Sequence, residues 1–111
     1  MQIKHINTIK ELEKAIMTGV ALVDFGAPWC VPCRAQEPIM EDLAIRFKDR
    51  AVIAVMNVDK HKPMARKLGI KSIPTLTLYK NGREVMRFVG LQPTRTLADA
   101  VEANLKAAAT S

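Results

Sequence analysis

The chain has 111 residues, of which 49% are hydrophobic and 25% are charged, and its formal net charge is +6. This length and balance are enough for one domain spanning residues 1–111, and they exclude a disordered chain. No stretch approaches the roughly 18 apolar residues of a membrane span, and the first residues lack the apolar core of a secretion signal. We therefore expect a cytoplasmic protein that does not contact membranes.

The first predicted elements are a helix, a buried strand and a second helix. Thr8 and Glu11 have the spacing of a capping box before a helix that stops at Gly19. Residues 20–25 form a short apolar run with one acid, Asp24, which is typical of a strand inside a sheet. The next apolar residues recur at offsets of three and four and predict one face of a helix: Ile39, Met40, Leu43, Ala44 and Phe47.

The second half continues with shorter elements and ends in a helix. The predicted elements are a strand over 51–58, a short helix over 63–68, strands over 75–79 and 84–89, and a helix that begins near residues 93–94. Asn81 and Gly82 predict a two-residue hairpin turn between the last two strands. The order of these elements predicts an α/β fold, a three-layer α/β/α sandwich whose central mixed sheet is flanked by helices.

Both cysteines of the chain, Cys30 and Cys33, lie at the predicted turn from strand to helix. Side chains three apart in a first helical turn are roughly 5 to 6 Å apart at their β-carbons, close enough to form a disulfide after a small adjustment. The free N–H groups of a helix N-terminus favour a thiolate. We expect Cys30 to be the activated sulfur and Cys33 to be more shielded. Pro32 suits this first turn because its missing N–H would have no partner there.

Three other interpretations of the two cysteines remain open at this point. A zinc site would need His5 and His61, which have no ligand spacing and are remote in sequence. A structural disulfide would close a very short loop and stabilise the fold by only about 2 kcal/mol. The third possibility is two buried cysteines that act as small apolar residues.

Asp24 is the second candidate for chemistry. An ionised acid inside an apolar strand costs several kcal/mol without a partner, so we expect its pKa to rise towards neutral pH. Such a carboxyl group can exchange protons with a thiol. The alternative is an acid at the end of the strand that reaches solvent or caps a turn.

Six short motifs in order resemble those of the thioredoxin family, and they extend over nearly the whole chain. They are Val23-Asp24-Phe25, the Trp-Cys-x-Pro-Cys turn from Trp29 to Cys33, Pro38, Ile73-Pro74-Thr75, Asn81-Gly82 and Val89-Gly90. The resemblance implies a thioredoxin-like fold in which a cis proline, Pro74, faces the sulfurs and Asp24 lies behind Cys33.

The resemblance also implies an enzyme that reduces protein disulfides. Cys30 would attack the substrate, and Cys33 would resolve the mixed disulfide with Asp24 handling the proton. The catalytic residues expected are therefore Cys30, Cys33, Asp24 and Pro74. The residues expected to bind substrate are Trp29, Val31, Pro32, Ile73, Val89 and Gly90.

The expected partners are disulfide-containing proteins and a thioredoxin-reductase-type enzyme that uses a nicotinamide cofactor. The chain itself is expected to act as a monomer with no bound cofactor or metal beyond its own redox-active Cys30–Cys33 disulfide. The positive charge favours acidic partners and does not by itself imply nucleic acid. An oxidase or isomerase of the same fold, or a binding module without turnover, remains an alternative.

Three positions depart from the family's pattern. Val31 stands where many thioredoxins have Gly, Gly26 where many have Trp, and Val55 where many have a Lys close to the buried acid. Because of the last of these, we expect Asp24 to lack the usual cation.

Overall fold

A mixed five-stranded sheet in the order β1-β3-β2-β4-β5 forms the middle layer of the computed structural model. The model describes residues 3–110, with side chains through residue 106. The strands are β1 (Lys4–Ile6), β2 (Val20–Gly26), β3 (Val52–Asn57), β4 (Thr75–Lys80) and β5 (Arg83–Val89). β3 runs parallel to β1 and β2, whereas β4 runs antiparallel to β2 and β5.

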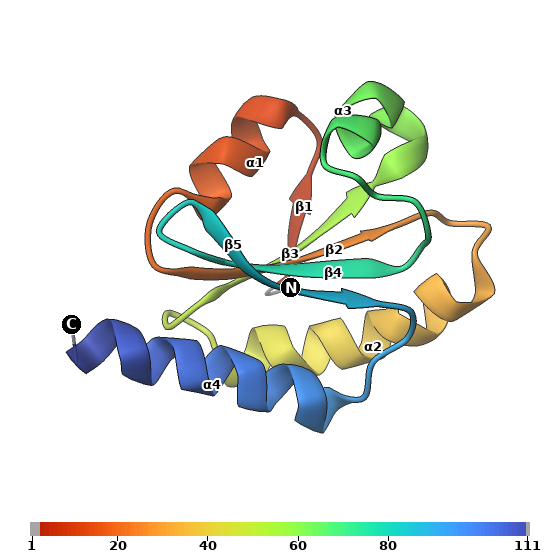
Figure 1. Ribbon diagram of the computed structural model, residues 1–111. Coiled ribbons are helices and arrows are strands. Elements are labelled where there is room, and N and C mark those ends of the chain that lie inside the picture. Colours follow the sequence, from red (N-terminus) through yellow and green to blue (C-terminus); the bar gives the residue numbers. More distant parts are fainter. Residues whose placement is uncertain (1–2, 111) are drawn as a thin grey trace.

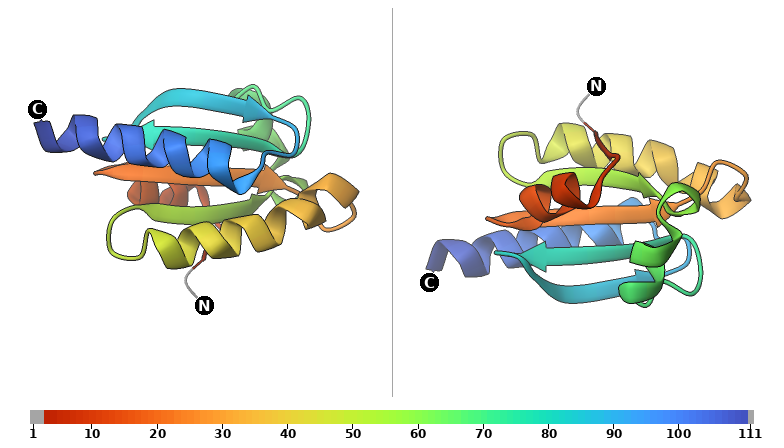
Figure 2. Two further views of the ribbon diagram at one scale, coloured as in Figure 1. Left: turned by 90° about the horizontal axis from the view of Figure 1, so that it is seen from below. Right: turned by 90° about the horizontal axis from the view of Figure 1, so that it is seen from above.

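Helices cover both faces of the sheet, as Figure 1 and the two views of Figure 2 show. They are α1 (Ile9–Ile16), α2 (Val31–Arg46), α3 (Lys62–Lys67) and α4 (Thr94–Thr110), with a short 3-10 helix η1 (Val58–Lys60) before α3. α2 and α4 lie on one face, and α1 and α3 lie on the other. The predicted three-layer α/β/α sandwich is therefore confirmed. Within residues 3–110, none of these helices combines the length and the apolar character needed to cross a bilayer.

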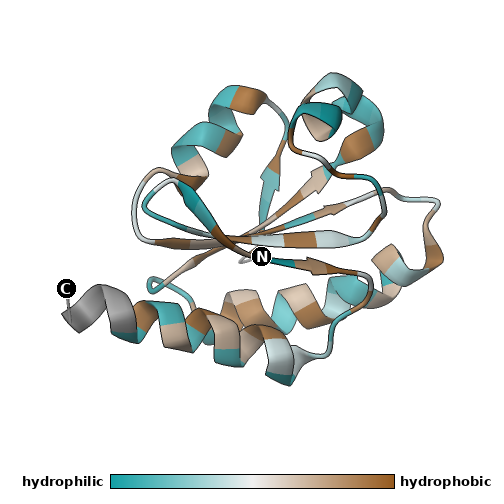
Figure 3. Cartoon of the chain, in the orientation of Figure 1, coloured by the Kyte–Doolittle hydropathy of each residue, from teal (hydrophilic) through white to brown (hydrophobic). Residues whose placement is uncertain are grey.

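The side chains of β2 alternate between the two layers of core. Val20 and Leu22 pack in the cluster that includes α2 and α4, whereas Ala21, Val23 and Phe25 pack in the cluster that includes α1 and α3. Because neighbouring side chains of a strand point to opposite faces, Asp24 shares the α2 side with Val20 and Leu22. Figure 3 shows the hydrophobic central strands between helices that alternate along their length between hydrophilic and hydrophobic residues.

The predicted turns and caps are confirmed. Asn81 and Gly82 have φ angles of 51° and 87°, the positive values that a two-residue hairpin turn requires. Asn81 also connects this hairpin to the turn between α1 and β2, since its Oδ1 accepts a hydrogen bond from Gly19 N–H at 2.8 Å. Thr8 caps α1 by accepting the Glu11 N–H at 3.0 Å.

Two elements were absent from the prediction. β1 has only three residues and gains its backbone hydrogen bonds from β3, so nothing local in the sequence marks it. η1 begins where residues 51–58 were expected to continue as a strand, because the Asn57 side chain accepts the Asp59 N–H at 2.9 Å and starts a turn there. The other predicted elements occur with ends shifted by one or two residues.

Candidate active site

The two cysteines lie at the start of α2 and form a disulfide, with their Cα atoms 5.2 Å apart. Cys30 is the N-cap residue, and its Sγ accepts the backbone N–H of Cys33 at 3.3 Å. Pro32 lies in the first helical turn, where no N–H is needed. A sulfur at this cap meets the positive end of the helix, so the backbone stabilises negative charge on Cys30 once the disulfide is reduced.

The expectation that Cys33 is more shielded than Cys30 is wrong, because each residue is 5% exposed. Cys30 is covered because it packs with Ala27 and Ile73 in a small apolar cluster. Its Sγ lies 3.8 Å from the Ile73 carbonyl oxygen. In the disulfide, Cys30 Sγ carries no proton and cannot donate a hydrogen bond to this oxygen. A reduced Cys30 thiol could donate to it. The helix cap, and not exposure, therefore distinguishes the two sulfurs.

Pro74 lies immediately before β4, and the Ile73-Pro74 peptide is cis, as the family resemblance implied. The pairing of Phe25 with Thr75 places this segment beside the end of β2, from which the cysteine turn begins. Gly90 joins it from the end of β5, since the Gly90 N–H donates to the Pro74 carbonyl at 2.8 Å. The structure thus brings three segments that are distant in sequence together at one end of the strands β2, β4 and β5.

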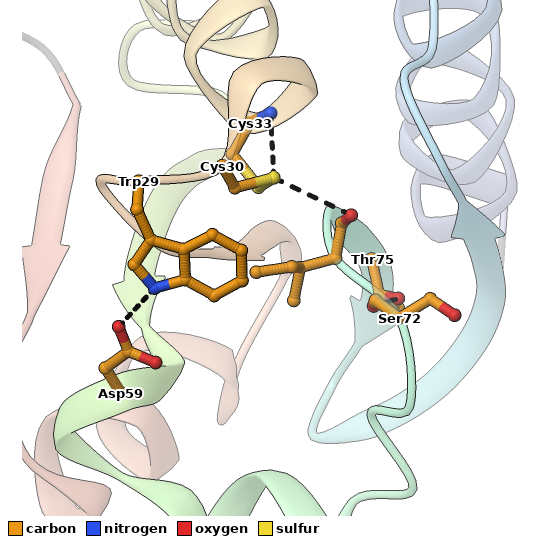
Figure 4. The surroundings of a disulfide bond; sticks show 7 residues. Trp29, Cys30, Cys33, Asp59, Ser72 and Thr75 are labelled. Carbon is orange, nitrogen blue, oxygen red and sulfur yellow. Dashed lines mark hydrogen bonds between the residues drawn. A yellow bond between two sulfur atoms is a disulfide. The ribbon is translucent and has the colours of Figure 1, made fainter.

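Exposed apolar side chains surround the disulfide. Trp29 is 65% exposed, Val31 67% and Val89 61%, values far from those of core residues. The Trp29 indole Nε1–H donates to Asp59 Oδ2 at 2.6 Å and holds the ring beside the cysteines (Figure 4). Asp59 was missed in the sequence analysis, because nothing in the pattern links two residues that are thirty positions apart.

Asp24 is 4% exposed, and its Oδ1 has no hydrogen-bond partner among the described residues. Gly26 leaves open the space between this carboxyl group and Cys33. A β-carbon at Gly26 would lie 3.1 Å from Cys33 Sγ and 3.9 Å from Asp24 Oδ1, so both atoms border the same small volume. The acid therefore lies behind Cys33, and the alternative of an acid that reaches solvent at the strand end is wrong.

Burial, followed by repulsion from Glu37, raises the pKa of Asp24 from 3.8 to about 7. Glu37 is one helical turn after Cys33, a spacing that could have identified it from the sequence. Asp24, Cys33 and Glu37 line a cavity of about 380 Å³. Its other charged or titratable lining residues are His5, Glu41, Lys60 and His61. A carboxyl group with a pKa near neutral therefore lies beside Cys33, in a cavity with several polar lining residues.

The zinc interpretation finds no support in the geometry. Within residues 3–110, no cluster of three or more His, Cys, Asp or Glu side chains is arranged to hold a metal ion. His5 and His61 line the cavity behind Cys33, but both sulfurs are engaged in the disulfide.

Comparison with known proteins identifies the family of the chain. The family model for thioredoxin matches residues 3–103. A thioredoxin of Staphylococcus aureus (strain Mu50 / ATCC 700699) is 38% identical over 98 residues, which cover 88% of this chain and 94% of that protein.

Solved structures give the same result. A mutant thioredoxin from Halobacterium salinarum NRC-1 superposes with a TM-score of 0.86 at 35% identity, covering 94% of this chain and 91% of the other. Thioredoxin from Malassezia sympodialis gives 0.82 at 26% identity, covering 93% and 90%. With its CxxC pair joined as a disulfide at the start of α2, the chain belongs to the thioredoxin family and is a thiol–disulfide oxidoreductase.

Proposed function

We propose that this chain reduces protein disulfides through Cys30 as nucleophile and Cys33 as resolving thiol, with Val31 between them as the family motif's variable residue. The observation that carries the proposal is the cap of α2, where Cys30 Sγ accepts the Cys33 N–H at 3.3 Å. This hydrogen bond lowers the free energy of the Cys30 thiolate, which is the reactive form in disulfide exchange.

The reaction transfers two electrons from the reduced pair to the substrate. The Cys30 thiolate attacks one sulfur of the substrate disulfide, so that a mixed disulfide forms and the other substrate sulfur leaves as a thiolate, which takes a proton. Cys33 then loses its proton and attacks Cys30 Sγ. The second substrate sulfur leaves as a thiolate, which takes a proton from solvent. The Cys30–Cys33 disulfide is the oxidised product.

Asp24 is the proposed acceptor of the Cys33 proton. Its carboxylate borders the same volume as Cys33 Sγ, and its pKa of about 7 is suited to exchange with a thiol. The same cavity leads past Glu37, through which the proton can reach solvent.

The proposed substrate surface is the apolar lip around the disulfide. It consists of the exposed apolar residues and the turns beside Pro74: Trp29, Val31, Pro32, Ile73, Val89 and Gly90. Pro74 lacks an N–H, so the neighbouring backbone of Ile73 is the group available to pair with an extended substrate segment.

The remaining features of the proposal follow from the family. Disulfide-containing proteins are the substrates, and a thioredoxin-reductase-type enzyme with a nicotinamide cofactor restores the dithiol. The chain acts as a single domain over residues 1–111, as a monomer, and in the cytoplasm, where the reducing conditions suit such a donor.

Reduction of insulin disulfides with dithiothreitol as electron source tests the proposal. We expect turnover with the native chain and none with Cys30→Ser. A reduction potential near −270 mV would agree with a reductant, whereas one near −120 mV would indicate an oxidase. Binding of insulin without turnover would contradict the proposal and favour a binding module.

A further inference from the structure

Gln36 is a polar residue with no exposed surface on the inner face of α2, one turn after Cys33. Its amide makes two hydrogen bonds with the backbone of one residue. Nε2–H donates to the Gln92 carbonyl at 3.0 Å, and Oε1 accepts the Gln92 N–H at 2.8 Å. The Gln36 amide thus pairs with the Gln92 backbone as a residue of a neighbouring strand would. These two hydrogen bonds offset the free-energy cost of burying the amide.

Gln92 lies in the irregular segment between β5 and α4. This segment begins at Gly90, directly after Val89, the last residue of β5. Gln92 Nε2–H donates to the Gly90 carbonyl at 3.3 Å, and the Gly90 N–H donates to the Pro74 carbonyl at 2.8 Å. A path of hydrogen bonds therefore runs from the helix of Cys33 to the segment before β4. Gln36 is the side chain at its helix end.

We propose that Gln36 is a positioning residue that fixes the Val89–Gly90 part of the lip relative to the cysteines, and so selects for protein disulfides over small ones. The inference rests on the proposed function, because it takes Val89 and Gly90 to contact substrate. An apolar residue of similar size would fill the core equally well. It would leave the Gln92 N–H and carbonyl without these partners, so the segment would be less fixed before binding and protein substrates would bind more weakly.

The test compares two substrates of different size with the variant Gln36→Met, which keeps the side-chain length but cannot form the two hydrogen bonds. We expect kcat/KM for insulin to fall about tenfold, mainly through KM. The rate with dithiobis(nitrobenzoate), which is too small to need the whole lip, is expected to stay unchanged. Faster amide exchange at Gln92 should accompany the loss.

The variant Gln36→Glu adds a readout that a merely structural role would not change. A protonated glutamic acid can donate to the Gln92 carbonyl and accept its N–H, whereas the carboxylate repels the carbonyl. We expect the ratio of the insulin rate to the small-disulfide rate to recover as the pH falls. A lower pH reduces the amount of Cys30 thiolate for both substrates equally, so this effect cancels in the ratio. The Gln36→Glu variant also decides the question if Gln36→Met does not fold.

Asn104→Leu is the matched control, since it removes a half-buried amide whose hydrogen bond, among the residues with described side chains, goes to the Ala100 carbonyl of the same helix. It should leave the substrate ratio unchanged. Equal losses on both substrates with Gln36→Met, or a ratio for Gln36→Glu that does not respond to pH, would overturn the inference. Failure of the native chain to reduce insulin would instead contradict the proposed function.

Discussion

Asp24 lies opposite Val55 in the parallel pairing of β2 with β3, so the nearest residue on the adjacent strand offers no charge to the buried carboxyl group. None of the ion pairs found within residues 3–110 involves Asp24. Repulsion from Glu37 raises the Asp24 pKa further. Burial is the largest cause of the raised pKa, and the pairing with Val55 adds no charge that would offset it.

Cys33→Ser is expected to accumulate a covalent adduct between Cys30 and substrate, whereas Cys30→Ser is not. The serine variant keeps the backbone N–H of residue 33 that stabilises the Cys30 thiolate, and it lacks the thiol that would release the substrate. Mass spectrometry after mixing with an oxidised protein substrate measures the adduct. More adduct on Cys33 of the Cys30→Ser variant would reverse the two roles.

Trp29→Phe should lower kcat/KM for insulin about fivefold, because it removes a hydrogen bond of about 1 kcal/mol that orients the ring. The indole N–H donates to Asp59 at 2.6 Å, and phenylalanine has no such donor. Asp59→Asn is the matched control. The amide oxygen of asparagine can still accept the hydrogen bond, so this substitution should lower kcat/KM less. A larger loss with Asp59→Asn than with Trp29→Phe would assign Asp59 a separate role.

Much of this architecture could be predicted from local sequence patterns. The hairpin at Asn81-Gly82 and the cap at Thr8 depend on residues within a few positions of one another, and both occur. The cysteine turn was placed correctly at the start of a helix for the same reason. Asp24 was identified because one acid in an apolar run is costly whatever surrounds it.

What the sequence did not reveal depends on contacts between distant segments. Gln36 looks like a surface residue of a helix until Gln92, 56 positions away, is seen to pair with it. Asp59 acquires its role only from Trp29. The equal burial of the two cysteines arises because Ile73 packs against Cys30, which no spacing within the CxxC motif could indicate.

Glu37→Gln should lower the pKa of Asp24, because repulsion by the Glu37 carboxylate is the second cause of its rise. The pH dependence of the resolving step, measured in single-turnover experiments, should move to lower pH. Glu41→Gln is the matched control, since Glu41 lines the same cavity but is not a cause of the shift. Equal shifts of this pH dependence with both variants would mean that the total charge of the cavity, and not Glu37 in particular, raises the pKa of Asp24.

Asp24→Asn should make the protein more stable at pH 7 while slowing resolution by Cys33. The Asp24 pKa is about 7 in the folded chain against 3.8 ordinarily, so the folded state holds more protons than the unfolded state between these values. The stability of the native chain therefore falls as the pH rises from about 4 and levels off above about 7, a loss on the order of 4 kcal/mol. The amide does not ionise, so the variant avoids this loss, and it cannot accept the Cys33 proton.

Denaturant unfolding across pH 4 to 8 and single-turnover rates on the same samples decide this prediction. The variant's stability should be nearly flat where that of the native chain declines. Asp42→Asn, at an exposed position of α2, should keep the decline and the native rate. A variant of Asp24 that is less stable than the native chain at pH 7, or that resolves equally fast, would show that this carboxyl group is solvated or paired in solution and does not carry the proton.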